Sequence, residues 1–246
     1  MINSNISIQD NNIESLRKEA YEHFKQRKFL KALEFFEEIL KNVQHSPEDQ
    51  KSASTWNLSY NKCKLENLNE LTNALCKNST LTSLNLNFNG LGAEGGKALA
   101  DAVCKNSTLT SLNLCDNNLG AEVGKALADA LCKNSTLTSL DLGWNNLGSE
   151  GGKALADALC KNSTLISLNL SWNNLGADEG KALADALCKN STLTSLDLGS
   201  NILGSEGGKA LADALCKNST LTSLNIKNNC IYFKLNINNP KIKIYE

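Results

Sequence analysis

The chain has 246 residues and a formal net charge of −1, with 25 Lys and Arg against 26 Asp and Glu. It contains no uninterrupted run of about 18 apolar residues, which excludes a membrane-spanning helix of ordinary length. The charges are spread along the chain and form no clustered basic stretch of the kind that nucleic-acid phosphates require. Neither a membrane nor a nucleic acid is therefore an expected partner.

The N-terminal region is predicted to hold a disordered tail and a helical hairpin. Residues 1–12 are mostly polar and are expected to be disordered. From residue 13 to residue 43, apolar residues recur at helical spacing on either side of a break at 26–28, which predicts two antiparallel helices. We therefore assign residues 13–52 to a helical hairpin and a polar linker.

The hairpin resembles a single tetratricopeptide repeat. Ala20 and Ala32 stand at the small positions of that pattern, and Phe24, Phe29 and Phe36 stand at its aromatic positions. Because one such hairpin cannot bury its own apolar face, we expect it to cap the repeats that follow. The alternative is a short arm that binds a partner.

Seven copies of a 28-residue unit follow and are the dominant signal of the sequence. The third copy reads LTSLNLCDNNLGAEVGKALADALCKNST, from Leu109 to Thr136. The copies begin at Ala53, Leu81, Leu109, Leu137, Leu165, Leu193 and Leu221. This period predicts a solenoid over residues 53–231, with six full repeats and a partial seventh.

Each unit is predicted to form one short strand and one helix. Apolar residues at positions 1, 4, 6 and 11 of the unit indicate a buried strand, and the second half follows the i, i+3, i+4 spacing of a helix. Ser149 is a candidate N-cap for its helix. Asn106 is a candidate for a left-handed residue that closes a helix.

The pattern L-x-x-L-x-L-x-x-N-x-L resembles the leucine-rich repeat, and the 28-residue period resembles its ribonuclease-inhibitor subclass. That subclass also occurs in the sensor regions of NACHT-type immune receptors and in the Ran GTPase-activating family. The resemblance implies an α/β fold, a right-handed solenoid bent into an open horseshoe arc. A parallel sheet would line the concave face, helices would cover the convex face, and the concave face would bind another protein.

Position 9 of the unit is asparagine in every copy. An invariant amide among leucines predicts a buried side chain that satisfies backbone groups where the chain leaves the strand. The members of this structural asparagine ladder are Asn61, Asn89, Asn117, Asn145, Asn173, Asn201 and Asn229.

The period fails after Cys230, and residues 232–246 are expected to form a C-terminal cap. Apolar residues alternate before and after Asn238, Asn239 and Pro240, which predicts a β-hairpin. The fold class is therefore a leucine-rich-repeat solenoid with an αα-hairpin at one end and a β-hairpin at the other.

No catalytic, metal or cofactor site is expected. Six of the nine cysteines share one repeat position, and neighbouring helices are too far apart for disulfides, which indicates reduced thiols in the cytoplasm. The two histidines, His23 and His45, lie outside the repeats, so no cysteine of the repeats has a histidine base from the same units. The thiols at the shared position are expected to pack between helices.

The variable positions of the unit indicate a binding surface. Position 8 holds Tyr, Phe, Asp, Trp, Trp, Ser and Asn in successive copies, and no core site accepts all of these. Position 5 is Asn in five copies and Asp in two, and it faces the same side as position 7. The predicted protein-binding residues of the concave face are Tyr60, Phe88, Asp116, Asp141, Trp144, Trp172 and Asp197.

We expect a monomeric, non-enzymatic scaffold whose partner is a protein. Asp116 and Asp141 would favour a basic or hydrogen-bond-donating segment of that partner. Two alternatives stay open: a regulator of a GTPase or another enzyme, and a structural repeat protein without a fixed ligand.

Overall fold

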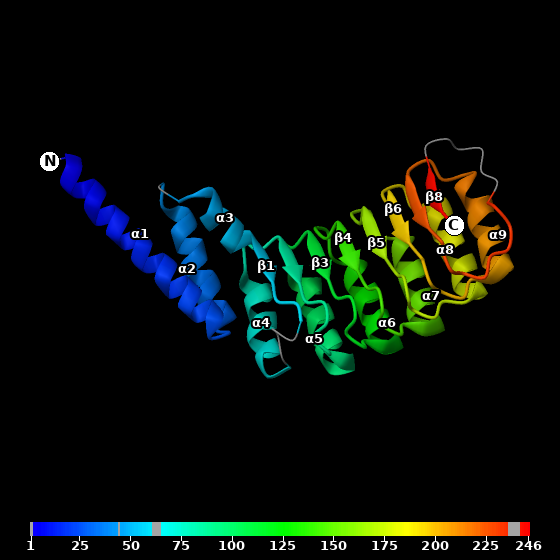
Figure 1. Ribbon diagram of the computed structural model, residues 1–246, viewed down its shortest axis with the longest axis horizontal. Helices are drawn as coiled ribbons and strands as arrows, with labels where there is room; N and C mark the ends of the chain where they lie inside the picture. Colours follow the sequence, from blue (N-terminus) through cyan, green and yellow to red (C-terminus); the bar gives the residue numbers. More distant parts are fainter. Residues whose placement is uncertain (1, 44, 61–64, 236–241) are drawn as a thin grey trace.

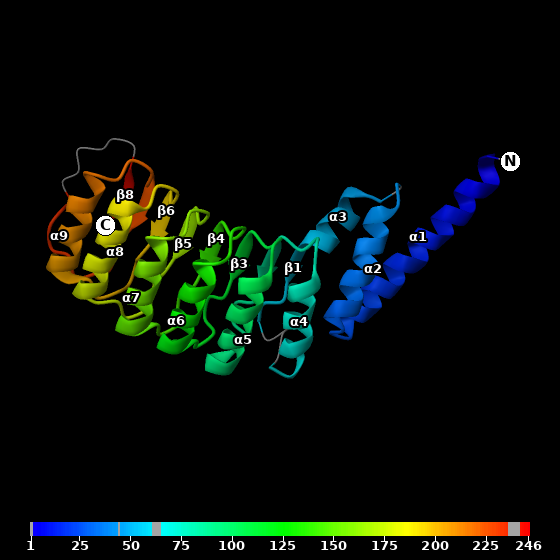
Figure 2. The same cartoon turned by 180° about the vertical axis from the view of Figure 1, so that it is seen from behind.

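The computed structural model describes residues 2–43, 45–60, 65–235 and 242–246, and these form an elongated arc (Figure 1). Helices at the N-terminal end lead into alternating strands and helices. Seen from behind, the helices lie side by side along the outer, convex side, with the strands on the inner side (Figure 2). The parallel sheet and the helical layer that the leucine pattern predicts are both confirmed.

The N-terminal helices are α1 (Ile2–Lys25), α2 (Phe29–Lys41) and α3 (Pro47–Ser54). Helices α1 and α2 form the predicted hairpin. Helix α1 begins at Ile2, within the segment 1–12 for which the sequence predicts disorder, and projects from the body of the arc (Figure 1). Once the packed part of a helix has formed, each added residue contributes one hydrogen bond, and this segment contains no proline or glycine to stop it.

Helix α3 lies where the sequence indicated only a linker. Ser46 is its N-cap: the side chain of Ser46 accepts from the Asp49 amide, and the Asp49 carboxylate accepts from the Ser46 amide at 2.7 Å. Pro47 occupies the first turn. Arg17 of α1 then donates to Asp49 from Nε at 2.9 Å and from Nη2 at 2.6 Å, which ties α1 to α3.

The repeats supply seven three-residue strands and six helices to the described structure. The strands are β1 (Thr55–Asn57), β2 (Ser83–Asn85), β3 (Ser111–Asn113), β4 (Ser139–Asp141), β5 (Ser167–Asn169), β6 (Ser195–Asp197) and β7 (Ser223–Asn225). The helices are α4 (Leu65–Lys77), α5 (Gly92–Lys105), α6 (Gly120–Leu131), α7 (Gly148–Leu159), α8 (Ala177–Lys189) and α9 (Gly204–Leu215). Neighbouring strands are parallel and paired at an offset of one repeat, such as Leu112 with Leu140.

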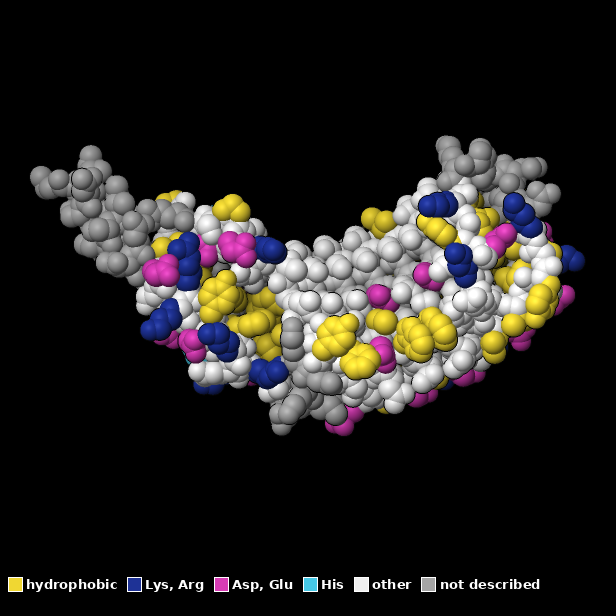
Figure 3. Space-filling model, viewed as in Figure 1, with side chains coloured by type: hydrophobic (Ala, Val, Ile, Leu, Met, Phe, Trp, Pro, Cys, Tyr) yellow, Lys and Arg dark blue, Asp and Glu magenta, His cyan; other side chains and the backbone are white. Residues whose placement is uncertain are grey.

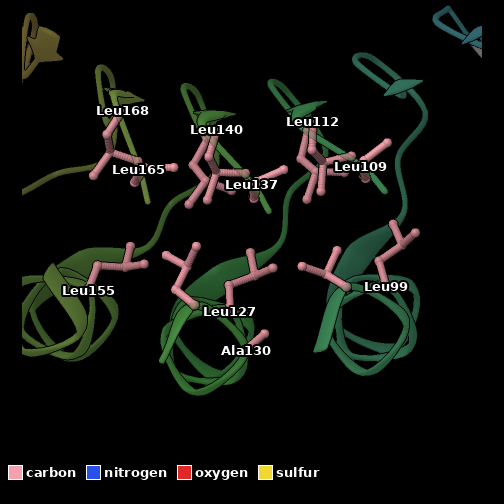
Figure 4. Packing of buried hydrophobic residues seen from close by; sticks show 14 of the residues in the cluster. Leu99, Leu109, Leu112, Leu127, Ala130, Leu137, Leu140, Leu155, Leu165 and Leu168 are labelled. Carbon is pink, nitrogen blue, oxygen red and sulfur yellow. The ribbon is translucent and has the colours of Figure 1, made fainter. Parts of the chain in front are cut away.

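The core lies between the two layers. Leucines from the strand side, such as Leu112 and Leu140, point toward helix leucines such as Leu127 and Leu155 (Figure 4). Leu112, Leu127 and Leu155 are at most 1% exposed. Because every repeat buries its leucines against the next one, the core is continuous along the arc.

Small residues set the spacing of the helices. A Cβ added to Gly124 in α6 would lie 2.7 Å from the Cα of Gly151 in α7, closer than real Cβ atoms approach backbone. Glycine at this position therefore allows close helix contact. The predicted caps differ from the structure, because α7 begins at Gly148 without a side-chain cap, and Asn106 closes α5 with an extended backbone of φ −77° and ψ 138°.

Trp56 joins the N-terminal hairpin to the solenoid. It stands in β1 where strands β2 to β7 have leucine, and it is 2% exposed. Its ring lies 4.9 Å from the ring of Phe24, 5.6 Å from Phe29 and 6.5 Å from Phe36, measured between centroids. The hairpin thus covers the first strand's core position, which suits a capping element.

The C-terminal end differs from the predicted β-hairpin. Residues 231–235 contain no strand, and β8 (Lys243–Tyr245) pairs in parallel with β7, with Ile244 opposite Leu224. The predicted turn residues 238–240 lie outside the described residues. The open edge of β7 explains the outcome: its backbone groups need partners, and the Ile226 amide donates to the Tyr245 carbonyl at 2.8 Å. An alternating Lys-Ile-Tyr segment matches the Ser-Leu-Asn strand, so it extends the sheet.

Candidate functional site

Four aromatic side chains at position 8 form a row along the solenoid. Tyr60 is 67% exposed, Phe88 47%, Trp144 50% and Trp172 46%. We call these four residues the aromatic row. Figure 3 shows hydrophobic side chains gathered along the front flank of the arc.

The row consists of two pairs in ring contact. Trp144 and Trp172 stack with their ring centroids 4.0 Å apart and their planes at 18°. Tyr60 and Phe88 lie 5.5 Å apart at a tilt of 38°. Asp116 occupies the same position of the repeat between the two pairs.

The aromatic row lies just past the ends of the strands whose concave face the sequence predicts to bind a partner. Position 8 falls in a bend three residues after each strand ends, as at Phe88 after β2. The backbone there turns into the left-handed region, with φ of 58° at Tyr60 and 57° at Phe88, Trp144 and Trp172. Strand alternation does not extend into a turn of this kind, so position 8 belongs to the rim of the sheet and not to a strand.

The predicted acidic residues of the strands lie on the concave surface. Asp141 and Asp197 are half-buried at the ends of β4 and β6. Each accepts a hydrogen bond from the amide two residues later, from Gly143 at 3.0 Å and from Gly199 at 2.8 Å. Burial raises the pKa of Asp141, and the charge of Asp197 raises it further.

Two positions of the repeat are correlated, which the sequence prediction did not include. Position 7 is glycine only in the two copies in which position 5 is aspartate. A Cβ at Gly143 would lie 3.3 Å from Oδ1 of Asp141, and one at Gly199 would lie 3.1 Å from Oδ1 of Asp197. Glycine thus leaves room around both carboxylates. Comparing the copies position by position could have found this signal.

The position-9 asparagines are buried and hydrogen-bonded, with Asn61 outside the described residues. Asn145 is 0% exposed, and its Nδ2 donates to the carbonyls of Leu114, Leu142 and Gly143 at 2.9, 3.1 and 3.0 Å. Its Oδ1 accepts from the Asn117 amide at 3.0 Å. Burial holds for Asn89, Asn117, Asn145, Asn173, Asn201 and Asn229. Each of them links its own repeat to the one before.

A second buried asparagine ladder follows the helices, and the sequence reasoning missed its role. Asn134 is 6% exposed, and its Nδ2 donates to the Val103 carbonyl of the preceding repeat at 2.8 Å. Its Oδ1 accepts from the amides of Thr136 and Leu137 at 3.0 and 2.8 Å. The equivalent residues are Asn78, Asn106, Asn134, Asn162, Asn190 and Asn218, all 6–8% exposed. Their invariance across copies was the available signal.

An aromatic-lined hollow of about 190 Å³ lies where the N-terminal hairpin meets β1. Its lining residues are Tyr21, Phe24, Phe36, Ser52, Thr55, Trp56 and Asn57. Tyr21 is 41% exposed, and its hydroxyl lies 2.8 Å from Oγ of Ser52. Thr55 and Asn57 are in register with Ser83 and Asn85 of β2, so the hollow adjoins the concave surface.

The cysteines at the shared repeat position lie on the helical side. Cys104 and Cys160 are half-buried against the core, whereas the other four are exposed, so the prediction of packing between helices holds only in part. All eight cysteines in the described ranges are free thiols, and Cys63 lies outside those ranges. Within the same ranges, no group of three His, Cys, Asp or Glu side chains is placed to hold a metal ion. No described helix combines the length and apolar character that crossing a membrane requires.

A parallel sheet that adds one strand and one helix every 28 residues defines a solenoid repeat protein. The chain belongs to the leucine-rich repeat family, whose members typically serve as protein-interaction scaffolds. The family model described as "Leucine Rich repeat" matches residues 77–100, 105–128, 133–156, 161–184, 189–212 and 217–231, together more than half of the chain. The copy at Ala53 precedes these matches, but β1 pairs with β2 in the common register.

A solved structure shows the same fold. A crystal structure of the Rad7 and Elc1 complex in yeast matches with a TM-score of 0.51 and 19% identity, over 74% of this chain and 44% of that chain. Two weaker matches are the actin-binding site 2 of leiomodin-1 (TM-score 0.49, 26% identity, 51% of this chain and 75% of that chain) and LegL7 from Legionella pneumophila (0.44, 24%, 82% and 71%). A search of curated proteins finds no match to this chain.

Proposed function

We propose that this chain is a non-enzymatic scaffold that binds a protein partner along the aromatic row and the adjoining concave surface. The observation that carries the proposal is the backbone conformation of the row. Trp144 and Trp172 are about half exposed and have a left-handed backbone, a region in which bulky residues are outliers.

The chain itself shows that the fold does not need aromatics there. Asn228 and Ser200 occupy the same position in other repeats at φ values of 57° and 54°. Asn tolerates the left-handed region, whereas placing a bulky residue there costs about 1 kcal/mol or more of conformational free energy. Four aromatic residues thus occupy places where a small polar residue would be more stable, which supports selection for a ligand.

The chemistry of the row also favours a protein. Tryptophan and tyrosine are the residues most often found as energetic anchors of protein interfaces. An exposed apolar row would promote aggregation unless a partner covers it. The hollow beside Trp56 extends the surface toward the N-terminal hairpin, where the lining ring of Tyr21 is accessible.

The experiment compares capture of partners from a cell lysate by tagged wild-type protein and by the double variant Trp144→Ala, Trp172→Ala. We expect the double variant to lose the partners that the wild type retains. The matched control is Ile202→Ala, which removes an exposed apolar side chain, 60% exposed, outside the row. Unchanged capture by the double variant, with an intact fold, would contradict the proposal.

Two other functions are tested by the same material. A regulator of a GTPase would change the rate of GTP hydrolysis by a captured GTPase, whereas a scaffold would not. A structural repeat protein would retain no partner in the wild-type form. A cytoplasmic location, which the free thiols support, is part of this proposal, and so is a monomeric state.

A further inference from the structure

The aromatic row is interrupted at one place, and the interruption carries a charge. Asp116 separates the Tyr60–Phe88 pair from the Trp144–Trp172 pair. It is half-buried, and its carboxylate has neither a hydrogen bond nor an ion pair with any side chain in the described ranges. A carboxylate between two aromatic surfaces is suited to a cation, because ring faces and carboxylate both attract positive charge.

The geometry leaves room for a flat group beside Asp116. Backbone hydrogen bonds keep position 8 in register between repeats. The Phe88 amide donates to the Cys115 carbonyl at 3.0 Å, and the Asp116 amide donates to the Gly143 carbonyl at 2.9 Å. Phe88 and Trp144 are two strand spacings apart, about 10 Å. A planar group between two rings needs about 7–8 Å, which is two van der Waals contacts. Trp172 stacks on one face of Trp144, and the side chain of Trp144 remains 50% exposed.

A hollow of about 220 Å³ lies on the Phe88 side of Asp116, lined by Phe88, Gly90, Asp116, Asn117 and Asn118. Gly90 opens it: the equivalent residue in the next three repeats is asparagine, and a Cβ at Gly90 would meet nothing within 4 Å. The exposed ladder from Asn118 through Asn146 to Asn174 therefore has no counterpart beside Phe88.

The surrounding surface has a uniform sign of charge. The strand and loop segments 81–90, 109–118, 137–146, 165–174 and 193–202 contain no Lys or Arg, whereas Asp116, Asp141 and Asp197 all belong to them. A cation brought by a partner would therefore meet no positive charge from these segments.

We propose that Asp116, flanked by Phe88 and Trp144, binds an arginine side chain of the partner; this inference rests on the proposed function. A guanidinium group is planar, stacks on aromatic faces and donates two parallel hydrogen bonds to a carboxylate. A lysine ammonium is not planar and has no pair of parallel donors. The site formed by Phe88, Asp116 and Trp144, which we call the arginine slot, should therefore prefer arginine.

The test uses the three tryptophans of the full chain as reporters. N-acetyl-arginine methylamide is titrated into ¹⁵N-labelled protein, and the indole N–H signals are followed by NMR. We expect a saturable shift at Trp144, whereas Trp56, at 2% exposed, stays unchanged as an internal control. The lysine and norleucine analogues, titrated in the same way, are expected to bind several-fold more weakly and not at all, respectively.

Asp116→Asn keeps a residue that tolerates the left-handed backbone and removes only the charge. It should weaken binding of the arginine probe about fivefold or more. The matched control Asp129→Asn removes an exposed carboxylate from the helical side and should leave binding unchanged.

Absence of a saturable shift, equal affinity for the lysine probe, or unchanged affinity of Asp116→Asn would each overturn the arginine slot. These outcomes leave the proposed function standing if the Trp144→Ala, Trp172→Ala variant still loses its partners. If the arginine probe does not bind and the double variant also captures partners normally, both the arginine site and the proposed function are contradicted.

Discussion

Oδ1 of Asn145 accepts a hydrogen bond at 3.0 Å from the backbone amide of Asn117, which lies one repeat earlier in the chain. The same side chain donates to three carbonyls, one of them in the preceding repeat. One residue per turn thus satisfies backbone groups that cannot reach water, which links the local turn to the stacking of repeats.

We expect Asn145→Ala to lower the free energy of unfolding by roughly 1–3 kcal/mol, because it leaves buried backbone groups without partners. Urea unfolding followed by circular dichroism measures the change. The control is Asn146→Gly, at an exposed position with φ 52° where the second repeat has Gly90. Equal stability of Asn145→Ala and wild type would show that the ladder has no structural role.

The double variant Trp144→Asn, Trp172→Asn separates stability from binding. Losing the stacked pair should cost about 0.5–1.5 kcal/mol, while Asn relieves a left-handed backbone at two sites. We therefore expect a change of less than about 1 kcal/mol in the free energy of unfolding, together with loss of partner capture. A large drop in the unfolding midpoint would mean that the tryptophans are needed for the fold.

Hydrogen bonds from Arg17 and from Ser46 together lower the pKa of Asp49 to about 2. Because the folded pKa lies below the ordinary 3.8, the ion pair stabilises the hairpin above pH 4, and this contribution is lost as the pH falls toward 2. The full contribution is on the order of 2 kcal/mol.

The measurement follows Trp56 fluorescence in the background that lacks Trp144 and Trp172, because Trp56 packs against the hairpin. Between pH 5 and pH 2.5, Asp49→Asn should lose less stability than the parent. Parallel pH profiles of the two proteins would contradict the assignment.

Thiol reactivity should differ sharply between positions. Burial, together with the charges of Asp141 and Asp116, raises the pKa of Cys115 to about 11. Since the thiolate is the reactive form, Cys115 should be alkylated much more slowly at pH 8 than the exposed Cys132, and its rate should still rise with pH up to about 11. Mass spectrometry of alkylated peptides gives both rates.

After denaturation we expect nine free thiols and no bound zinc. Labelling of native Cys115 as fast as Cys132 would contradict its burial, and stoichiometric zinc would contradict the assignment of free thiols.

Periodicity alone determined the repeating architecture. Leucines such as Leu112 and Leu140 recur every 28 residues, and this pattern can be buried only by stacking one turn on the next. Asn145 and its equivalents indicated buried amides for the same reason, because asparagine recurs at position 9 in every copy. The aromatic residues at position 8 were also predicted to be exposed from variation among the copies.

Tertiary structure decided what no single repeat contains. The end of the sheet at β8 depends on which edge is open, and Lys243–Tyr245 is compatible with either a hairpin or a parallel strand. The rim position of Trp144 depends on a left-handed turn that strand alternation does not describe. Arg17 and Asp49 meet because α1 and α3 both pack against α2. A local sequence pattern does not predict such contacts between separate helices.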